Sequence, residues 1–129
     1  MLRWTGTLAA SATAVVLALA VAACGEDAPS GDTSAARGAE VYERYCASCH
    51  GSDLRGDPTG PTLLTELYAP EVFTDEAFRR SITAGAPQQH WGFGPMPMVG
   101  GVRGSDIDAV LAFVREQQAA GPLEPFPPG

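Results

Sequence analysis

One run of five residues constrains this chain more than any other feature: Cys46-Ala47-Ser48-Cys49-His50. Two cysteines three positions apart lie on the same face of a helix, and the histidine follows directly. Thiols in this arrangement can add to the two vinyl groups of one haem, and the adjacent imidazole is then placed beneath the iron. The spacing is the attachment signature of c-type haem. We therefore predict one covalent haem c on Cys46 and Cys49, with His50 as a ligand of its iron.

Three other kinds of site could use the same residues. A disulfide oxidoreductase uses the C-x-x-C pattern, but it expects a βαβ context that the sequence does not indicate. A zinc site could combine Cys46, Cys49, His50 and His90, although this spacing resembles no common zinc finger. A structural disulfide between the two cysteines is the third alternative.

The first 23 residues have the composition of an export signal. Arg3 supplies positive charge, and the apolar run over 8–23 is short for a membrane span but suits the central part of a signal peptide. The run ends in Val-Ala-Ala before Cys24, which resembles the bacterial lipobox. We predict a lipoprotein signal peptide over 1–23 and lipidation of Cys24. An ordinary signal followed by an incidental cysteine is the alternative.

The cysteine count favours lipidation. The chain has three cysteines, and the haem motif uses two of them, so an exported protein would be left with one unexplained thiol. Two or three acyl chains on Cys24 would anchor the protein stably. The expected location is extracytoplasmic, at the bacterial cell membrane.

The charge of the chain limits the classes of partner that it is expected to bind. All 15 acidic residues follow residue 23, against seven arginines and no lysine. Such an acidic chain is not expected to bind nucleic acid or anionic lipid headgroups. We expect membrane redox complexes as electron donor and acceptor.

Composition divides the remaining chain into three parts. Residues 24–36 are rich in small and polar residues without apolar periodicity, which predicts a lipidated N-terminus and flexible tether. Residues 37–120 form the predicted domain. Residues 121–129 contain four prolines, which predicts a disordered or polyproline-like tail.

The domain is predicted to be all-α. A first helix is expected from about Ala36 to Cys49, and Pro61 is expected to open a short helical turn. Long loops rich in Gly and Pro follow at 51–61 and 85–104. Few large apolar residues are available to cover these loops, so a large apolar cofactor would supply the missing core.

Two later helices have clearer ends. Thr74 is the expected N-cap of one, Phe73 and Phe78 its hydrophobic staple, and Gly85 its end. Arg79 and Arg80 are expected near that end, where they complement the helix dipole or pair with a haem propionate. The last helix is expected to begin at Ser105 in a capping box with Asp108 and to end by 121–122. Its predicted buried residues are Ile107, Val110, Leu111 and Val114.

Over residues 37–118 the chain resembles the class I cytochromes c. In that family a glycine and an aromatic residue precede the first haem cysteine by eight and four positions, as Gly38 and Tyr42 do here. Val110 and Phe113 resemble the family residues that cross this pair from the last helix. The resemblance implies a small class I cytochrome c fold, with three to five helices around one covalent haem.

The family resemblance extends to the loop after the haem motif. Gly60-Pro61-Thr62-Leu63 resembles the family's Gly-Pro-x-Leu stretch. The resemblance implies that the Pro61 carbonyl accepts a hydrogen bond from the proximal histidine and tunes its basicity. It also implies that Leu63 covers one face of the haem.

The second axial ligand has three candidates: Met96, Met98 and His90. A thioether is a soft ligand that favours ferrous iron and suits an electron carrier. In the family the axial methionine commonly stands directly before proline, which favours Met96 because Pro97 follows it. Met98 is the second choice, and ligation by His90 is the remaining alternative.

The resemblance implies a one-electron carrier of an extracytoplasmic respiratory or oxidoreductase chain. No catalytic residue is required, and the protein could be a subunit of an oxidoreductase complex. Two alternatives remain, a haem enzyme and a gas-binding module. Both need a labile or open sixth coordination position on the iron.

Overall fold

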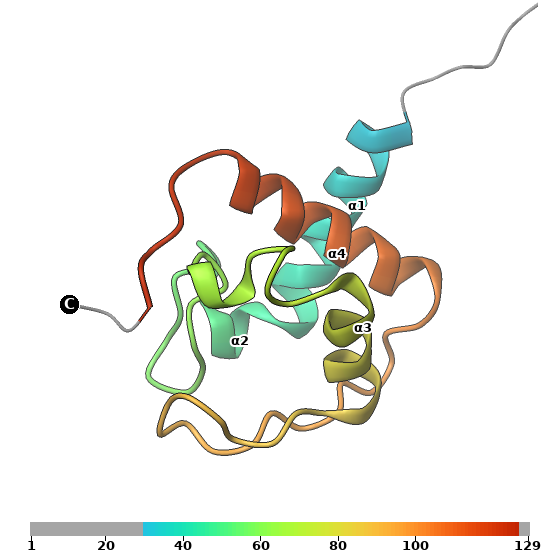
Figure 1. The fold of residues 1–129 in the computed structure, drawn as a ribbon. Helices are drawn as coiled ribbons and strands as arrows, with labels where there is room; N and C mark the ends of the chain where they lie inside the picture. Colours follow the sequence, from blue (N-terminus) through green and yellow to red (C-terminus); the bar gives the residue numbers. More distant parts are fainter. Residues whose placement is uncertain (1–29, 127–129) are drawn as a thin grey trace, which may run out of the picture.

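The computed structural model describes residues 30–126, and this range is helical as predicted (Figure 1). Its only β-type pairings are isolated bridges. None of the described helices is long and apolar enough to cross a membrane. The elements, in chain order, are α1 Ser30–Tyr45, α2 Ala47–His50, the 3-10 turn η1 Glu66–Tyr68, α3 Asp75–Ala84 and α4 Ser105–Ala119.

Helix α1 begins at Ser30, earlier than the sequence predicts. Residues 30–36, expected in the flexible tether, form its first turns. Alanine is the strongest helix former, and Ala35 is also buried, so tertiary packing supports this part of the helix. The predicted signal peptide, Cys24 and the first part of the predicted tether lie outside the described residues.

The expected single helix up to Cys49 is interrupted at Cys46. This residue has φ −121° and ψ −36°, and a second short helix, α2, begins after it. The Cys46 carbonyl accepts hydrogen bonds from the backbone N–H groups of Cys49 and His50, at 3.1 and 3.0 Å. The haem motif therefore stands on a new helical turn that can take a direction of its own (Figure 1).

Helices α1 and α4 cross in close contact, as Figure 1 shows. Gly38 lies at the crossing, where a β-carbon would be 2.0 Å from the Ala109 carbonyl oxygen. The Tyr42 and Phe113 rings pack at 5.5 Å between centroids, and Val110 is almost fully buried. The predicted pairing of these residues across the two helices is present in the structure.

Helix α3 begins as the sequence predicts. Thr74 is the N-cap, and its hydroxyl accepts a hydrogen bond from the Ala77 N–H at 3.3 Å. The Phe73 and Phe78 rings lie 6.4 Å apart, and Gly85 follows the last turn at φ +78°. The helix continues to Ala84.

The expected position of Arg79 and Arg80 at the end of α3 is wrong. Both lie in the middle of the helix, because it runs four residues beyond Arg80. Arg79 instead forms an ion pair with Asp108 of α4, at 2.9 Å.

Helix α4 begins at Ser105 as predicted, but the expected capping box is wrong. The N-cap is Gly104, without a side-chain hydrogen bond, and Ser105 is already the first helical residue. Asp108 is therefore free to pair with Arg79 on α3. All four apolar residues predicted to be buried on α4 are buried.

Two irregular segments differ from their predictions: a helical turn begins later than expected, and the described part of the tail is not disordered. The helical turn expected to begin at Pro61 begins only at Glu66, as η1, because the Leu63 N–H donates to the carbonyl of Leu54 in an earlier loop, at 2.7 Å. The described part of the tail, 121–126, is docked on the domain. Glu124 donates its N–H to the Leu64 carbonyl at 2.8 Å, a tertiary contact that local composition does not reveal.

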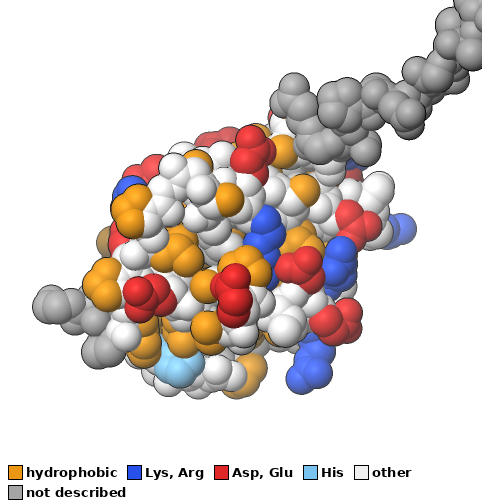
Figure 2. All heavy atoms as spheres, turned by 45° about the horizontal axis from the view of Figure 1, so that its top comes forward, with side chains coloured by type: hydrophobic (Ala, Val, Ile, Leu, Met, Phe, Trp, Pro, Cys, Tyr) orange, Lys and Arg blue, Asp and Glu red, His pale blue; other side chains and the backbone are white. Residues whose placement is uncertain are grey.

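Charged side chains lie among apolar ones on the surface in Figure 2. Their ion pairs are largely exposed, and such pairs typically contribute less than about 1 kcal/mol each. The apolar crossing of α1 and α4 therefore holds the domain more firmly than its surface charges do. The ion pairs of the described residues are Arg37–Asp106, Arg55–Glu124, Arg79–Asp108 and Arg115–Asp75.

The crossing gives a first testable prediction. Gly38→Ala should lower the free energy of unfolding by about 1–3 kcal/mol, because the new methyl group overlaps the Ala109 backbone. Denaturant unfolding of the matured protein measures this change. Gly100→Ala is the control, since a β-carbon there meets no atom within 4 Å. Equal stability of the two variants would contradict the close crossing.

Candidate haem site

An apolar cavity of about 590 Å³ lies between α2, α3 and the loops that follow them. Its volume is within the range of about 300–1,000 Å³ typical of cofactor pockets. Five of the residues expected at the haem site are on its wall: Cys46, His50, Pro61, Leu63 and Met96. Cys49 and Met98 are not among the lining residues.

The proximal histidine is held by the loop that follows it. His50 Nδ1 lies 2.9 Å from the Pro61 carbonyl oxygen. A carbonyl only accepts, so Nδ1 carries the proton and Nε2 keeps the lone pair that a metal needs. Burial lowers the pKa of His50, which favours the neutral imidazole. These contacts give His50 the protonation state of an iron ligand.

The two cysteines differ in their surroundings. Cys46 is half-buried on the cavity wall, and burial together with the nearby Cys49 raises the pKa of its thiol to about 11. Cys49 is exposed. Both are free thiols, so they do not form the alternative disulfide.

The other two alternatives also find no support in the described residues. No group of three or more His, Cys, Asp or Glu side chains there could hold a metal ion, which disfavours zinc. A disulfide oxidoreductase of the βαβ type needs a parallel sheet, and residues 30–126 contain no strand. Of the functions considered for the motif, haem attachment is the one that agrees with the cavity.

Close backbone packing shapes the proximal side. A β-carbon on Gly60 would lie 2.4 Å from the Cys49 carbonyl oxygen. Only glycine allows this approach, which brings the Pro61 carbonyl to His50. The Tyr42 hydroxyl donates to the Gly51 carbonyl at 2.7 Å, which ties α1 to the end of the haem motif.

The distal side is formed by the loop after α3. Ala86 and Met96 exchange backbone hydrogen bonds of 3.0 and 2.9 Å, which close the base of this loop. Met96 is half-buried and lines the cavity, whereas Met98 is 64% exposed and points elsewhere. His90 also lines the cavity but is exposed.

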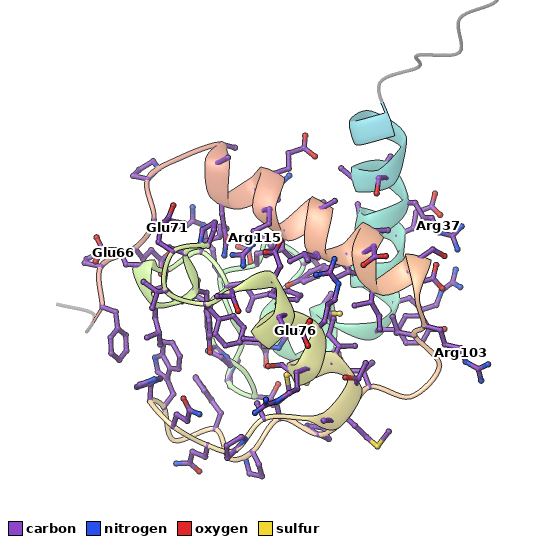
Figure 3. All side chains as sticks on the ribbon, turned by 45° about the vertical axis from the view of Figure 1, so that its right-hand side comes forward. Arg37, Glu66, Glu71, Glu76, Arg103 and Arg115 are labelled. Carbon is purple, nitrogen blue, oxygen red and sulfur yellow. The ribbon has the colours of Figure 1, made fainter. Side chains whose placement is uncertain are left out.

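Two residues that frame the site were not found by sequence reasoning. Arg115 of α4 donates to the backbone carbonyls of Tyr68 and Phe73, at 2.8 and 2.5 Å, and Figure 3 shows it between α4 and this segment. The buried Gln118 donates to the Leu63 carbonyl at 2.8 Å. Nothing in the sequence marks them, because they look like ordinary polar residues near the end of a helix.

The polar residues that line the cavity include Arg80, Gln88 and Gln89, together with the acidic Glu76. Arg80 has no ion-pair partner among the described residues, unlike Arg79 beside it. A mostly apolar wall with a few polar groups suits a ligand with an apolar body and a few polar groups. Haem, a large ring with two propionates, has this character.

The domain is helical and encloses an apolar cavity. A thiol and an imidazole lie on the cavity wall, and a second thiol lies beside them. This combination defines a c-type haem protein. The family model described as "Cytochrome c" matches residues 35–118. The chain therefore belongs to the cytochrome c family. Its cofactor is haem c with iron, and Cys46 and Cys49 stand at the positions of the C-x-x-C-H motif.

The fold agrees with a solved structure. The crystal structure of the c-type cytochrome XoxG from Methylobacterium extorquens AM1 matches with a TM-score of 0.53 and 22% sequence identity. The match covers 74% of this chain and 57% of that cytochrome. At this identity the likeness concerns the fold alone. No curated protein sequence matches the chain.

The packing of Gly60 gives a second prediction. Gly60→Ala should push the Pro61 carbonyl away from His50, because its methyl group meets the Cys49 backbone. A weaker hydrogen bond makes the imidazole a poorer electron donor to iron, so the midpoint potential should rise. Redox titration measures the shift. Gly92→Ala, with open space around its β-carbon, should leave the potential unchanged. A fall in the potential of Gly60→Ala would contradict this role.

Proposed function

We propose that this cytochrome is a one-electron carrier whose iron is bound by His50 and Met96. The observation that carries the proposal is that Met96 lines the same cavity as His50, while Met98 does not line it. His90 also lines it, but its side chain is exposed, whereas Met96 is half-buried.

When bound, the haem supplies the redox couple of ferric and ferrous iron. The residues of the chain hold this group and control access to it. The Pro61 carbonyl fixes the imidazole of His50, and Leu63 and Phe78 provide apolar surface on the cavity wall. The soft thioether of Met96 favours the ferrous state and raises the potential. With His50 and Met96 both bound to the iron, neither a substrate nor a gas would find an open site on it.

Variants of the two methionines test the ligand. The ferric protein should show a weak long-wavelength band from sulfur ligation, which Met96→Ala should abolish and Met98→Ala should keep. The ferrous Met96→Ala protein should bind carbon monoxide readily, while the unaltered protein should not. Persistence of the band in Met96→Ala would refute the assignment. Ready binding of carbon monoxide by the unaltered protein would favour a haem enzyme or gas-binding module.

We further propose that the protein works outside the cytoplasm, tethered to the membrane by lipid on Cys24. The support is the sequence alone: an apolar run after Arg3, and small residues directly before the cysteine. A lipid anchor would confine the carrier near membrane redox complexes and raise its effective concentration there.

The anchor is tested by labelling the protein in cells with a radioactive fatty acid. The unaltered protein should carry the label and Cys24→Ala should not, because the proposed acyl chains are attached to Cys24. Ser30→Ala, which leaves the lipobox intact, should keep the label. Label retained by Cys24→Ala would rule out lipidation through this residue.

The proposed redox partners would meet an acidic protein, with a formal net charge of −7. Several of its arginines are already paired with carboxylates, among them Arg37 and Arg55. A net negative charge makes association with a partner depend on ionic strength. The chain lacks lysine, so its docking surface differs from one built on a ring of lysines.

A further inference from the structure

The C-terminal segment, residues 121–126, is fastened to the proximal side of the haem cavity. Glu124 exchanges backbone hydrogen bonds with Leu64 and Glu66, at 2.8 and 2.9 Å, and its carbonyl also accepts from the Thr65 hydroxyl at 3.0 Å. Thr65 is only 1% exposed, and the Glu124 carboxylate pairs with Arg55. The segment therefore has a fixed position beside the loop that carries Pro61 and Leu63.

From this anchor the segment reaches the distal side. The Phe126 ring lies 5.3 Å from the His90 ring and 5.3 Å from the Trp91 ring, edge to face in both cases. Trp91 packs in turn on Tyr68, with 5.7 Å between the ring centroids. His90, Trp91 and Tyr68 all line the haem cavity, so Phe126 supports its wall from behind.

The loop that carries His90 and Trp91 has little else to hold it. Residues 87–95 make no hydrogen bond to any other described residue, and the backbone pair of Ala86 and Met96 closes only the base of the loop. The outer part is thus held by contacts between aromatic rings. Each such pair contributes about 0.5–1.5 kcal/mol beyond its buried area.

We propose that Phe126 is a positioning residue, which acts through His90 and Trp91 to keep the distal wall closed over the haem. The inference rests on the proposed His50 and Met96 ligation and goes beyond it. The tail is a strap between the two loops that flank the cavity. It sets how often the wall opens and how much water reaches the haem.

This role has two measurable consequences. An external ligand must displace Met96 to bind the iron, which requires the wall to open, so its apparent affinity is proportional to the open fraction. Burial of the haem in a dry pocket also sets its potential, because water stabilises the more highly charged ferric site. Loosening the wall should therefore raise ligand affinity and lower the midpoint potential.

The experiment compares Phe126→Ala with Phe126→Tyr in the matured full-length protein. Imidazole is titrated into the ferric form, and the midpoint potential is measured in parallel. Phe126→Ala should raise the affinity for imidazole about tenfold, because it removes two edge-to-face contacts. It should also lower the potential. Phe126→Tyr, which keeps the ring, should restore both values.

Ile107→Val separates this role from general loosening, since it removes a buried methyl group from a core residue that does not line the cavity. If Ile107→Val changes imidazole affinity and potential as much as Phe126→Ala does, the inference is overturned. Unchanged values in Phe126→Ala also overturn it. The proposed function fails separately, if Met96→Ala binds imidazole no more tightly than the unaltered protein.

Discussion

At Gly38 the backbones of α1 and α4 come so close that no side chain fits between them. This contact sets the direction of α1, and the haem motif begins directly after its last residue, Tyr45. It also orients α4, whose Arg115 and Gln118 hold the carbonyl groups of the segment 63–73. One glycine thus links the proximal motif to the opposite wall of the cavity. Both sides of the cavity are attached to helices that are fixed at this crossing, so the cavity keeps its shape.

The haem takes the place of a conventional core in this domain. The buried residues form a cluster around the helix crossing, while the space between α2, α3 and the two loops is left to the cofactor. Gly60 and Pro61 explain how long irregular loops become ordered: one allows a close backbone approach, and the other gives its carbonyl to His50. The Gly- and Pro-rich composition is thus part of the site.

Much of this arrangement was accessible from the sequence, because it depends on local rules. The start of α3 at Thr74 follows from capping, and the buried face of α4 follows from helical spacing. The pairing of Gly38 and Tyr42 with α4 and the bond from His50 to Pro61 needed the family resemblance. Spacing alone could not supply contacts between residues so far apart in the chain.

The predictions that were wrong depended on tertiary contacts. The break at Cys46 is invisible to a pattern that treats both flanking segments as helical. The capping box expected at Ser105 is absent, and Asp108 instead pairs with Arg79 on another helix. The tail has the composition of a disordered segment, yet the Glu124 carbonyl accepts a hydrogen bond from the hydroxyl of Thr65, 59 residues away. Composition predicts the conformation of an isolated segment, whereas contacts with neighbouring segments determine the conformation of this tail.

The docked tail also bears on how the protein is purified. A polyhistidine tag fused after Gly129 would begin four residues beyond Phe126, at most about 14 Å from it along the chain. Phe126 packs against His90 and Trp91 of the cavity wall, so a tag joined to this end would bring further imidazoles, which are common metal ligands, to the same part of the molecule. Spectra of such a fusion would report the tag as well as the protein, and a cleavable or histidine-free tag avoids this.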